Sequence, residues 1–291
     1  MRFLFKTLIV LYLFFSIFDN LLFAQQIREP RKCIMVFGAH ADDIEQIAGG
    51  TLAKFMDEGY EGVYVVVINN TAGCLIEKAP GLWDFEKKEF IQPKSPKTYP
   101  PDALETIQIR TEEALQAAAV FGAIPVFLNF SELVIWQGRK KCLFGTEDYY
   151  NFNPPGRPAV SISTRHSDQI DAVVKCLETY KPEISIIHTL GGEKHDHGNS
   201  AYLMYLAFMK ARSMGIPVGK LWMKVDGWYL EPEAPVNGRG QPDGKIEITE
   251  YNKTKYKALN KHLSQKGGKR GLDIRLGEKY FEKFITVIGN F

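Results

Sequence analysis

Short apolar runs alternate along this chain with longer segments whose apolar residues have helical spacing. The apolar runs at 33–37 and 62–69 predict buried strands, and the segment between them, 48–58, predicts a helix that ends before Gly59. Two more helix–strand units follow, with helices at 104–121 and 167–180 and strands at 125–129 and 183–188. This alternation predicts an α/β fold with a Rossmann-like, mostly parallel sheet and helices on both faces.

The later pattern predicts a helix at 200–214, strands at 221–230 and 245–249, and a helix at 253–263. Two segments, 73–101 and 137–158, interrupt the alternation and are longer than ordinary connections. Within the second, Tyr149, Tyr150 and Phe152 follow neither a helix nor a strand period, so we expect an irregular segment. We interpret both as insertions, either loops over a binding site or mobile surface segments.

The first residues have the pattern of an export signal. Arg2 and Lys6 precede an apolar stretch at 7–18, and Ala24 offers a small residue at a cleavage point. We therefore predict a signal peptide at 1–24 and a single domain at 25–291 that is periplasmic or extracellular. An uncleaved membrane anchor is the alternative. The pattern does not indicate an oligomeric state.

Charge and cysteine content exclude several classes of protein. The 36 basic and 34 acidic side chains leave a net charge of +2, which provides no basic field for nucleic acid. The four cysteines have no spacing typical of a metal site. Cys33 and Cys176 fall in apolar patterns typical of a core. Cys74 and Cys142 are candidates for a disulfide, which an export route would permit.

Two polar loops carry the candidate chemistry. His40-Ala41-Asp42-Asp43 follows the first predicted strand, and His195-Asp196-His197 follows the strand at 183–188. The carboxyl ends of parallel strands meet at one edge of a sheet, so we expect the two loops to lie together. One His and one Asp from the first loop and one His from the second would give a metal three protein ligands. Such a site keeps a position for water, which is typical of a catalytic metal.

These motifs resemble the LmbE-like or N-acetylglucosaminyl-phosphatidylinositol de-N-acetylase (PIG-L) family of zinc-dependent deacetylases. The family's His-Pro-Asp-Asp or His-Ala-Asp-Asp run followed by Gly-Gly-Thr is matched at 40–43 and 49–51. Its Asp-His motif at a helix start is matched at 196–197. Its Arg-x-x-Glu and His-x-Ser-Gln elements are similar to residues 110–113 and 262–265. The first two motifs are specific in combination, whereas the last two are weak alone.

The resemblance implies roles for individual residues. His40, Asp43 and His197 would bind Zn²⁺, with other divalent metals as alternatives, and Asp42 would be the general base for a metal-activated water. Arg110 would contact either a substrate hydroxyl or Asp42; the alternative is that it lies on a solvated helix face.

The second motif departs from the family pattern. Lys194 stands where the family commonly has a histidine, and His195 takes the next position. We therefore consider His195 a candidate for the acid role, and Asp196 a candidate to orient a neighbouring imidazole. Ile44 stands where an acidic residue is usual. His188 and His262 are expected to be structural.

The resemblance implies a hydrolase that removes the N-acetyl group from an N-acetylated amino sugar or glycoconjugate. Its partner would then be a small molecule or oligosaccharide, with neither nucleic acid nor a membrane beyond the signal peptide. Two alternatives remain open. One is a zinc amidohydrolase that acts on a non-sugar amide, and the other is a non-catalytic carbohydrate-binding protein derived from a deacetylase.

Overall fold

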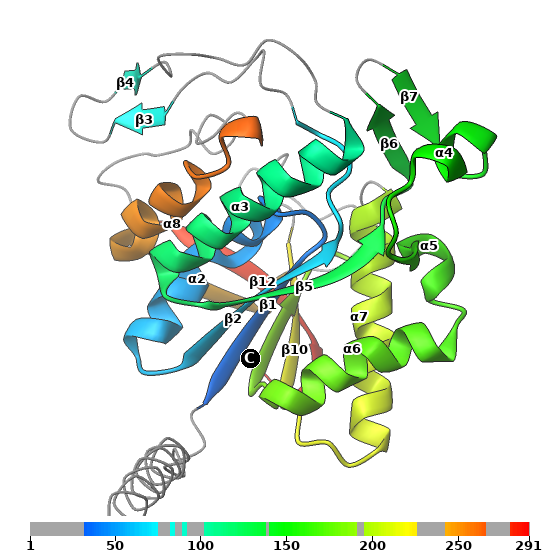
Figure 1. The fold of residues 1–291 in the computed structure, drawn as a ribbon. Coiled ribbons are helices and arrows are strands. Elements are labelled where there is room, and N and C mark those ends of the chain that lie inside the picture. Colours follow the sequence, from blue (N-terminus) through cyan, green and yellow to red (C-terminus); the bar gives the residue numbers. More distant parts are fainter. Residues whose placement is uncertain are drawn as a thin grey trace, which may run out of the picture. The chain divides into compact units, whose positions relative to one another are not determined.

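A computed structural model describes residues 32–74, 82–84, 89–91, 102–137, 140–190, 195–225, 242–265 and 280–290. All of them belong to one compact unit, Lys32–Phe291 (Figure 1). The predicted signal peptide lies outside the described residues. No helix in these ranges has the length and apolar character needed to cross a membrane.

Eight of the described strands form one sheet in the order β11-β12-β10-β9-β1-β2-β5-β8. Neighbours are parallel from β10 through β8, whereas β12 runs antiparallel to both β10 and β11. The fold prediction of a mostly parallel sheet is therefore confirmed. The strands span β1 Cys33–Gly38, β2 Glu61–Ile68, β5 Ile124–Ser131, β8 Arg157–Ala159, β9 Ile184–Ile187, β10 Lys220–Lys224, β11 Gly244–Glu247 and β12 Phe281–Ile288.

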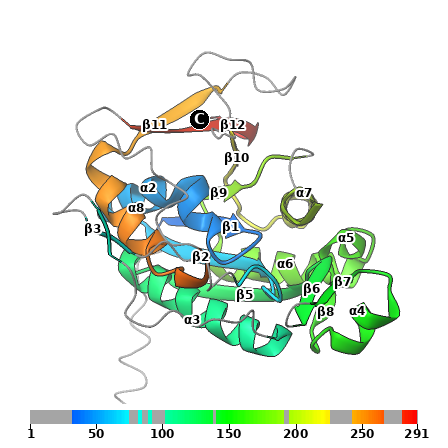
Figure 2. The same cartoon turned by 90° about the horizontal axis from the view of Figure 1, so that it is seen from above.

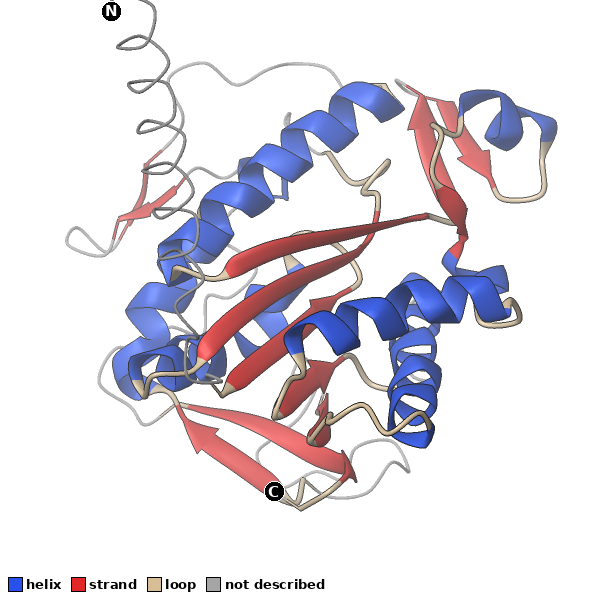
Figure 3. Cartoon of the chain, turned by 60° about the horizontal axis from the view of Figure 1, so that its bottom comes forward, coloured by secondary structure: helices blue, strands red, loops and turns tan. Residues whose placement is uncertain are grey.

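Helices cover both faces of the sheet (Figures 2 and 3). One face packs against α2 (Asp43–Asp57), α3 (Ala103–Phe121) and α8 (Asn252–Leu259). The other packs against α5 (Val160–Ser163), α6 (Ser167–Tyr180) and α7 (His195–Ser213). Strand β1 is buried on both sides, because Met35 faces one layer of helices and Val36 faces the other. This explains why its sequence is an apolar run without alternation.

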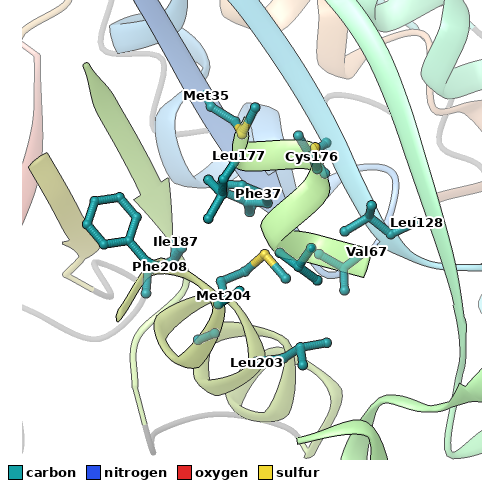
Figure 4. Close-up of a cluster of buried hydrophobic side chains, with 14 of the residues drawn as sticks. Met35, Phe37, Val67, Leu128, Cys176, Leu177, Ile187, Leu203, Met204 and Phe208 are labelled. Atoms are coloured by element: carbon teal, nitrogen blue, oxygen red, sulfur yellow. The ribbon is translucent and has the colours of Figure 1, made fainter. Parts of the chain in front are cut away.

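The core on the α6–α7 side joins strands and helices that are distant in sequence. Met35 and Phe37 of β1 lie in one cluster with Leu177 of α6 and Met204 of α7 (Figure 4). Each large apolar side chain removed from water in this way contributes about 1.5–3 kcal/mol of transfer free energy. This burial holds the start of α7 against the carboxyl ends of the strands, where the second polar loop was predicted.

The described residues of the segment at 137–158 form regular elements, which corrects the prediction of an irregular segment. A hairpin of β6 (Val134–Gln137) and β7 (Lys140–Leu143) precedes α4 (Glu147–Phe152), whose first turn is capped by Thr146. The buried ring of Tyr149 lies in a small cluster with Ile135 and Cys142. The helix is too short for its period to be evident in sequence. In the first insertion, β3 (Leu82–Asp84) pairs with β4 (Glu89–Ile91), and most of the rest lies outside the described residues.

Several element boundaries differ from the predictions. Strand β12 was not predicted, α7 begins at its polar loop rather than at residue 200, and α2 begins at Asp43. Helix α8 ends at Leu259 and is followed by the 3₁₀ turn η3 (Leu263–Gln265), while η2 (Thr249–Tyr251) precedes it. The four cysteines have free, buried thiols, so the candidate disulfide between Cys74 and Cys142 is not formed.

Helix α2 is kinked where the Gly-Gly-Thr motif begins. Ala48 has a φ of −157°, outside the helical range, and the helix kinks there. The N–H groups of Gly50 and Thr51 donate instead to the carboxylate of Glu282 in β12. Glycine is needed at position 50, because a Cβ there would lie 2.3 Å from the Ile248 side chain. The motif therefore lets α2 approach the polypeptide next to β11.

Candidate active site

The two predicted loops meet at the point where the strand order reverses. From β1, the chain continues through β2 and β5 on one side and through β9 and β10 on the other. His40, Asp42 and Asp43 follow β1, while His188 follows β9 and His197 lies in the first turn of α7. In open α/β sheets this reversal is the usual position of a ligand site.

The three predicted metal ligands present their ligand atoms to one another. His40 Nδ1 lies 3.1 Å from His197 Nε2 and 3.2 Å from Asp43 Oδ2, and the latter two atoms are 3.4 Å apart. One N–H on each neutral imidazole cannot satisfy all three contacts, whereas a divalent cation would be bound by all three atoms. Among the described residues, these three form the group of His, Cys, Asp and Glu side chains that could hold a metal ion. The donor set therefore fits a divalent metal.

Asp43 is held in its charged form by its surroundings. Burial raises the pKa of this carboxyl, but the imidazoles of His197 and His188 outweigh it and hold the pKa well below its usual range. The Oδ2 atom also accepts a hydrogen bond of 2.7 Å from the backbone N–H of His40. A carboxylate that stays ionised is the form that binds a metal.

The Asp42 carboxylate binds other partners than the adjacent Asp43 carboxylate does. Its Oδ1 accepts from Arg110 Nη2 at 3.0 Å, and its Oδ2 accepts from Gln46 Nε2 at 3.0 Å. Arg110 is 2 % exposed and also donates to the carbonyl of Ala72. The prediction that Arg110 contacts Asp42 is confirmed, and the alternative of a solvated helix face is wrong. The two adjacent carboxylates are therefore separated into different environments.

His188 belongs to this site, although the sequence indicated only a structural role. Its ring stacks on that of His197 with 4.4 Å between centroids, and its Nε2 lies 3.2 Å from Asp43 Oδ2. The same Nε2 accepts a hydrogen bond from the backbone N–H of Ala39. Burial lowers the pKa of His188, which favours the neutral ring that this hydrogen bond requires. His188 therefore holds the backbone next to His40 and packs against His197.

Glu132 is a site residue that sequence reasoning missed. It directly follows β5, is 2 % exposed, and places Oε1 3.9 Å from His40 Nε2. This oxygen finds no hydrogen-bond partner among the described residues. Burial raises the pKa of Glu132 to about 7. The signal was available, because a carboxylate at the end of a parallel strand is the same pattern that identified His40 and Asp43.

Comparison with known proteins identifies the family. The sequence pattern of the GlcNAc-PI de-N-acetylase (PIG-L) family matches residues 35–208, which is more than half of the chain. The chain belongs to the PIG-L family. The match includes both polar loops, Arg110 and Glu132.

Relatives of this PIG-L chain are named for two different activities, hydration and deacetylation. It is 26 % identical over 232 residues to 4-oxalmesaconate hydratase of Pseudomonas putida KT2440, covering 79 % of this chain and 72 % of the relative. The structure of 4-carboxy-2-hydroxymuconate hydratase from P. putida KT2440 is similar with a TM-score of 0.54 and 19 % identity, covering 89 % and 98 % of the two chains. N,N′-diacetylchitobiose deacetylase from Pyrococcus horikoshii has a TM-score of 0.53 and 18 % identity, covering 94 % and 92 %.

The second motif of this PIG-L chain is only partly described. His195 is the first residue of α7, and its side chain lies outside the described residues, as does Lys194. Asp196 is half-buried at the next position and contributes to the electrostatic environment of Glu132. The acid role of His195 and the orienting role of Asp196 therefore stay predictions.

The two weaker PIG-L motifs contact each other near the site. In the Arg-x-x-Glu element, the Glu113 carboxylate accepts hydrogen bonds from the N–H and hydroxyl of Ser264. His262, which is fully buried, places Nε2 3.4 Å from Glu45 Oε1. Burial opposes its protonation, but the nearby Glu45 raises the pKa of His262. These contacts tie α3, α2 and η3 together, and they give His262 the structural place that was predicted.

Proposed function

We propose that this protein is a metal-dependent hydrolase that removes the N-acetyl group from an N-acetylated amino sugar or glycoconjugate and releases acetate. One observation carries the proposal: the ligand atoms of His40, Asp43 and His197 lie within 4.8 Å of one another, next to the buried carboxylate of Asp42. Membership of a family described by de-N-acetylation supports this choice of reaction.

The metal site would be held by His40, Asp43 and His197. Zn²⁺ suits two imidazoles and a carboxylate, and other divalent metals accept the same set. When bound there, such a metal lowers the pKa of a water molecule and polarises an amide oxygen.

Asp42 would act as the base. Arg110 and Gln46 each bind one of its carboxylate oxygens, so the side chain is fixed in orientation. In amide hydrolysis a C–O bond forms to water and the C–N bond breaks, and one proton must move from the water to the departing amine. Asp42 would take that proton and return it to the nitrogen. Its position next to a metal ligand, but on different partners, supports this separate role.

Glu132 would bind the substrate. Its Oε1 lies 3.9 Å from His40 Nε2 and has no hydrogen-bond partner among the described residues, so it could accept from a hydroxyl or amide N–H of a substrate. A buried carboxylate with an open acceptor selects for a ligand that carries a donor, as a sugar does. The predicted export signal would bring such an enzyme into contact with cell-wall or extracellular glycans.

The test is acetate release from N-acetylglucosamine and N,N′-diacetylchitobiose by the zinc-loaded protein, with the Asp42→Asn variant as its matched control. We expect acetate and free amine in equal amounts from the unaltered protein and a loss of at least about 10³-fold in the variant. Sugar binding without acetate release, unchanged by Asp42→Asn, would instead favour a carbohydrate-binding protein. Acetate release from non-sugar amides alone would favour a general amidohydrolase.

A second candidate function is hydration of a carbon–carbon double bond. The observation that favours it is the similarity over 79 % of this chain to a hydratase of P. putida. Hydration would use the same activated water, with the hydroxyl and a proton added across the double bond of an unsaturated carboxylic acid. Loss of the ultraviolet absorbance of a conjugated unsaturated dicarboxylate, without acetate from any amide, would identify this activity.

A further inference from the structure

The backbone that carries His40 is held by partners outside the candidate metal cluster. At Ala39, the N–H donates to His188 Nε2 at 3.1 Å and the carbonyl accepts from the N–H of Ile68 at 3.0 Å. At His40, the N–H donates to Asp43 Oδ2 and the carbonyl accepts from the N–H of Asp43 at 3.3 Å. Both residues therefore have all their backbone hydrogen bonds satisfied.

Ala41, between the candidate ligand His40 and the candidate base Asp42, is held only by side chains. Its N–H donates to Asn70 Oδ1 at 2.9 Å, and its carbonyl accepts from the hydroxyl of Tyr64, which also lies 3.0 Å from Glu45 Oε1. Asn70 is 1 % exposed and Tyr64 is fully buried. The Asn70 amide cannot turn freely, because its Nδ2 donates to the carbonyl of Ile68 at 2.9 Å. Its oxygen is therefore fixed toward Ala41.

The backbone of Asn70 matches this task. Its φ of 60° lies in the left-handed region, where asparagine is among the few side chains that are readily tolerated. Asn70 is the second residue after β2, and its side chain reaches the loop after β1. A proline at position 41 would have a fixed φ and no N–H to satisfy. With alanine there, the φ has no ring to restrain it and the N–H needs a buried acceptor, which Asn70 supplies.

We propose that Asn70 and Tyr64 are positioning residues that set the geometry of His40 and Asp42 by holding both backbone polar groups of Ala41. Rotation of the peptides around Ala41 would move His40 away from His197 and Asp42 away from Arg110. The proposal rests on the metal site of the proposed function, but it makes its own claim about metal affinity, which needs no substrate.

The test compares two asparagines that share a backbone conformation. Asn129 has a φ of 57°, is exposed in β5 and is not among the hydrogen-bond partners of Ala41. Glycine tolerates this conformation, so Asn70→Gly and Asn129→Gly both keep the backbone and remove an amide. We expect Asn70→Gly to raise the Zn²⁺ dissociation constant about tenfold, as is typical when support for a metal ligand is lost. Asn129→Gly should leave it within about twofold of the unaltered protein, since it removes nothing near the metal.

Competition titration with a fluorescent zinc chelator measures these constants, and thermal unfolding shows that both variants are folded. Equal zinc affinities of the two variants would overturn the positioning role while leaving the proposed function intact. Absence of zinc binding by the unaltered protein would overturn both.

Two more variants test the role of Ala41 itself. Tyr64→Phe keeps the ring in the core and removes only the hydroxyl, and it should weaken zinc binding about fivefold, the equivalent of one lost neutral hydrogen bond. In an Ala41→Pro background the N–H that Asn70 binds is gone, so Asn70→Gly should then change zinc affinity by less than about twofold. An undiminished tenfold effect in that background, or no effect of Tyr64→Phe, would contradict the proposal.

Discussion

Two buried ion pairs in this molecule are similar in geometry, but their carboxylates bind different parts of the structure. Arg110 and Asp42 lie 3.0 Å apart, and Lys255 and Glu282 lie 2.7 Å apart. All four side chains are less than a tenth exposed. A buried pair of this kind contributes little net stability, because desolvation offsets most of the attraction, although loss of one partner is costly. The geometry of a pair by itself therefore does not indicate its purpose.

The surroundings of the two carboxylates show the difference. Glu282 uses both oxygens to bind the N–H groups exposed by the kink in α2, so it joins β12 to that helix. The Asp42 carboxylate binds the side chains of Arg110 and Gln46 and adjoins Asp43 at the point where the strand order reverses. We infer that the Glu282 pair maintains the fold, whereas the Asp42 pair orients a reactive carboxylate.

The largest effect is expected from Asp42→Asn. Because the amide cannot accept the proton from water, acetate release should fall by about 10³- to 10⁴-fold, the upper end of what a general base contributes. Zinc content should stay unchanged, since the metal ligands are untouched. Steady-state acetate release and elemental analysis measure these two quantities.

A double variant separates this loss from a loss of stability. Asp42→Asn leaves the charge of Arg110 buried and should lower the free energy of unfolding by about 3 kcal/mol. Adding Arg110→Met removes that charge and should restore most of the stability but none of the activity. Recovery of acetate release in the double variant would contradict the role of Asp42 as base.

Glu282→Gln should have the opposite profile. It leaves the charge of Lys255 without its partner and weakens the cap on α2, so we expect the free energy of unfolding to fall by about 3 kcal/mol. Turnover per folded molecule should stay within about threefold, because the pair touches no site residue. Urea unfolding and active-site-normalised rates check this. A large loss of turnover at full stability would show that the Glu282 pair also serves the site.

A smaller, pH-dependent effect is expected from Glu132→Gln in the metal-free protein. Because burial raises the pKa of Glu132 to about 7, the folded state retains a proton that the unfolded state loses near pH 4.5. Stability is therefore lost as the pH rises between these values. Glutamine cannot ionise, so its stabilising effect should be about 2 kcal/mol larger at pH 8 than at pH 5. The free energy of unfolding of both proteins is measured at pH 5 and pH 8. Equal stabilisation by Glu132→Gln at the two pH values would contradict the raised pKa.

The sequence was sufficient to predict the parallel strands β1, β2, β5, β9 and β10 and the convergence of the two polar loops. A run such as 33–37 has too little polar character for a surface strand, and the residue that follows a parallel strand lies at a known edge of the sheet. This rule placed His40 and Asp43 beside His197 although they are distant in sequence. The same rule, applied to Glu132 after β5 and His188 after β9, would have identified both.

Other features depend on tertiary contacts that a single sequence does not reveal. At the kink in α2, the N–H groups of Gly50 and Thr51 donate to Glu282 of β12, which is more than 230 residues away in sequence. Strand β12 follows residues 266–279, which lie outside the described structure, and its pairing with β10 could not be deduced from order along the chain. The partners of Ala41 come from one residue inside β2 and one after it, so spacing alone could not identify them.

The central claim, a divalent metal held by His40, Asp43 and His197, is tested most directly by metal content. The measurement is elemental analysis of the purified protein after zinc reconstitution, beside His197→Ala and the matched control His166→Ala, in which an exposed histidine before α6 is removed. We predict one zinc ion per chain in the unaltered protein and in His166→Ala, and loss of zinc in His197→Ala. Absence of stoichiometric zinc from the unaltered protein, or full zinc retention in His197→Ala, would contradict the account.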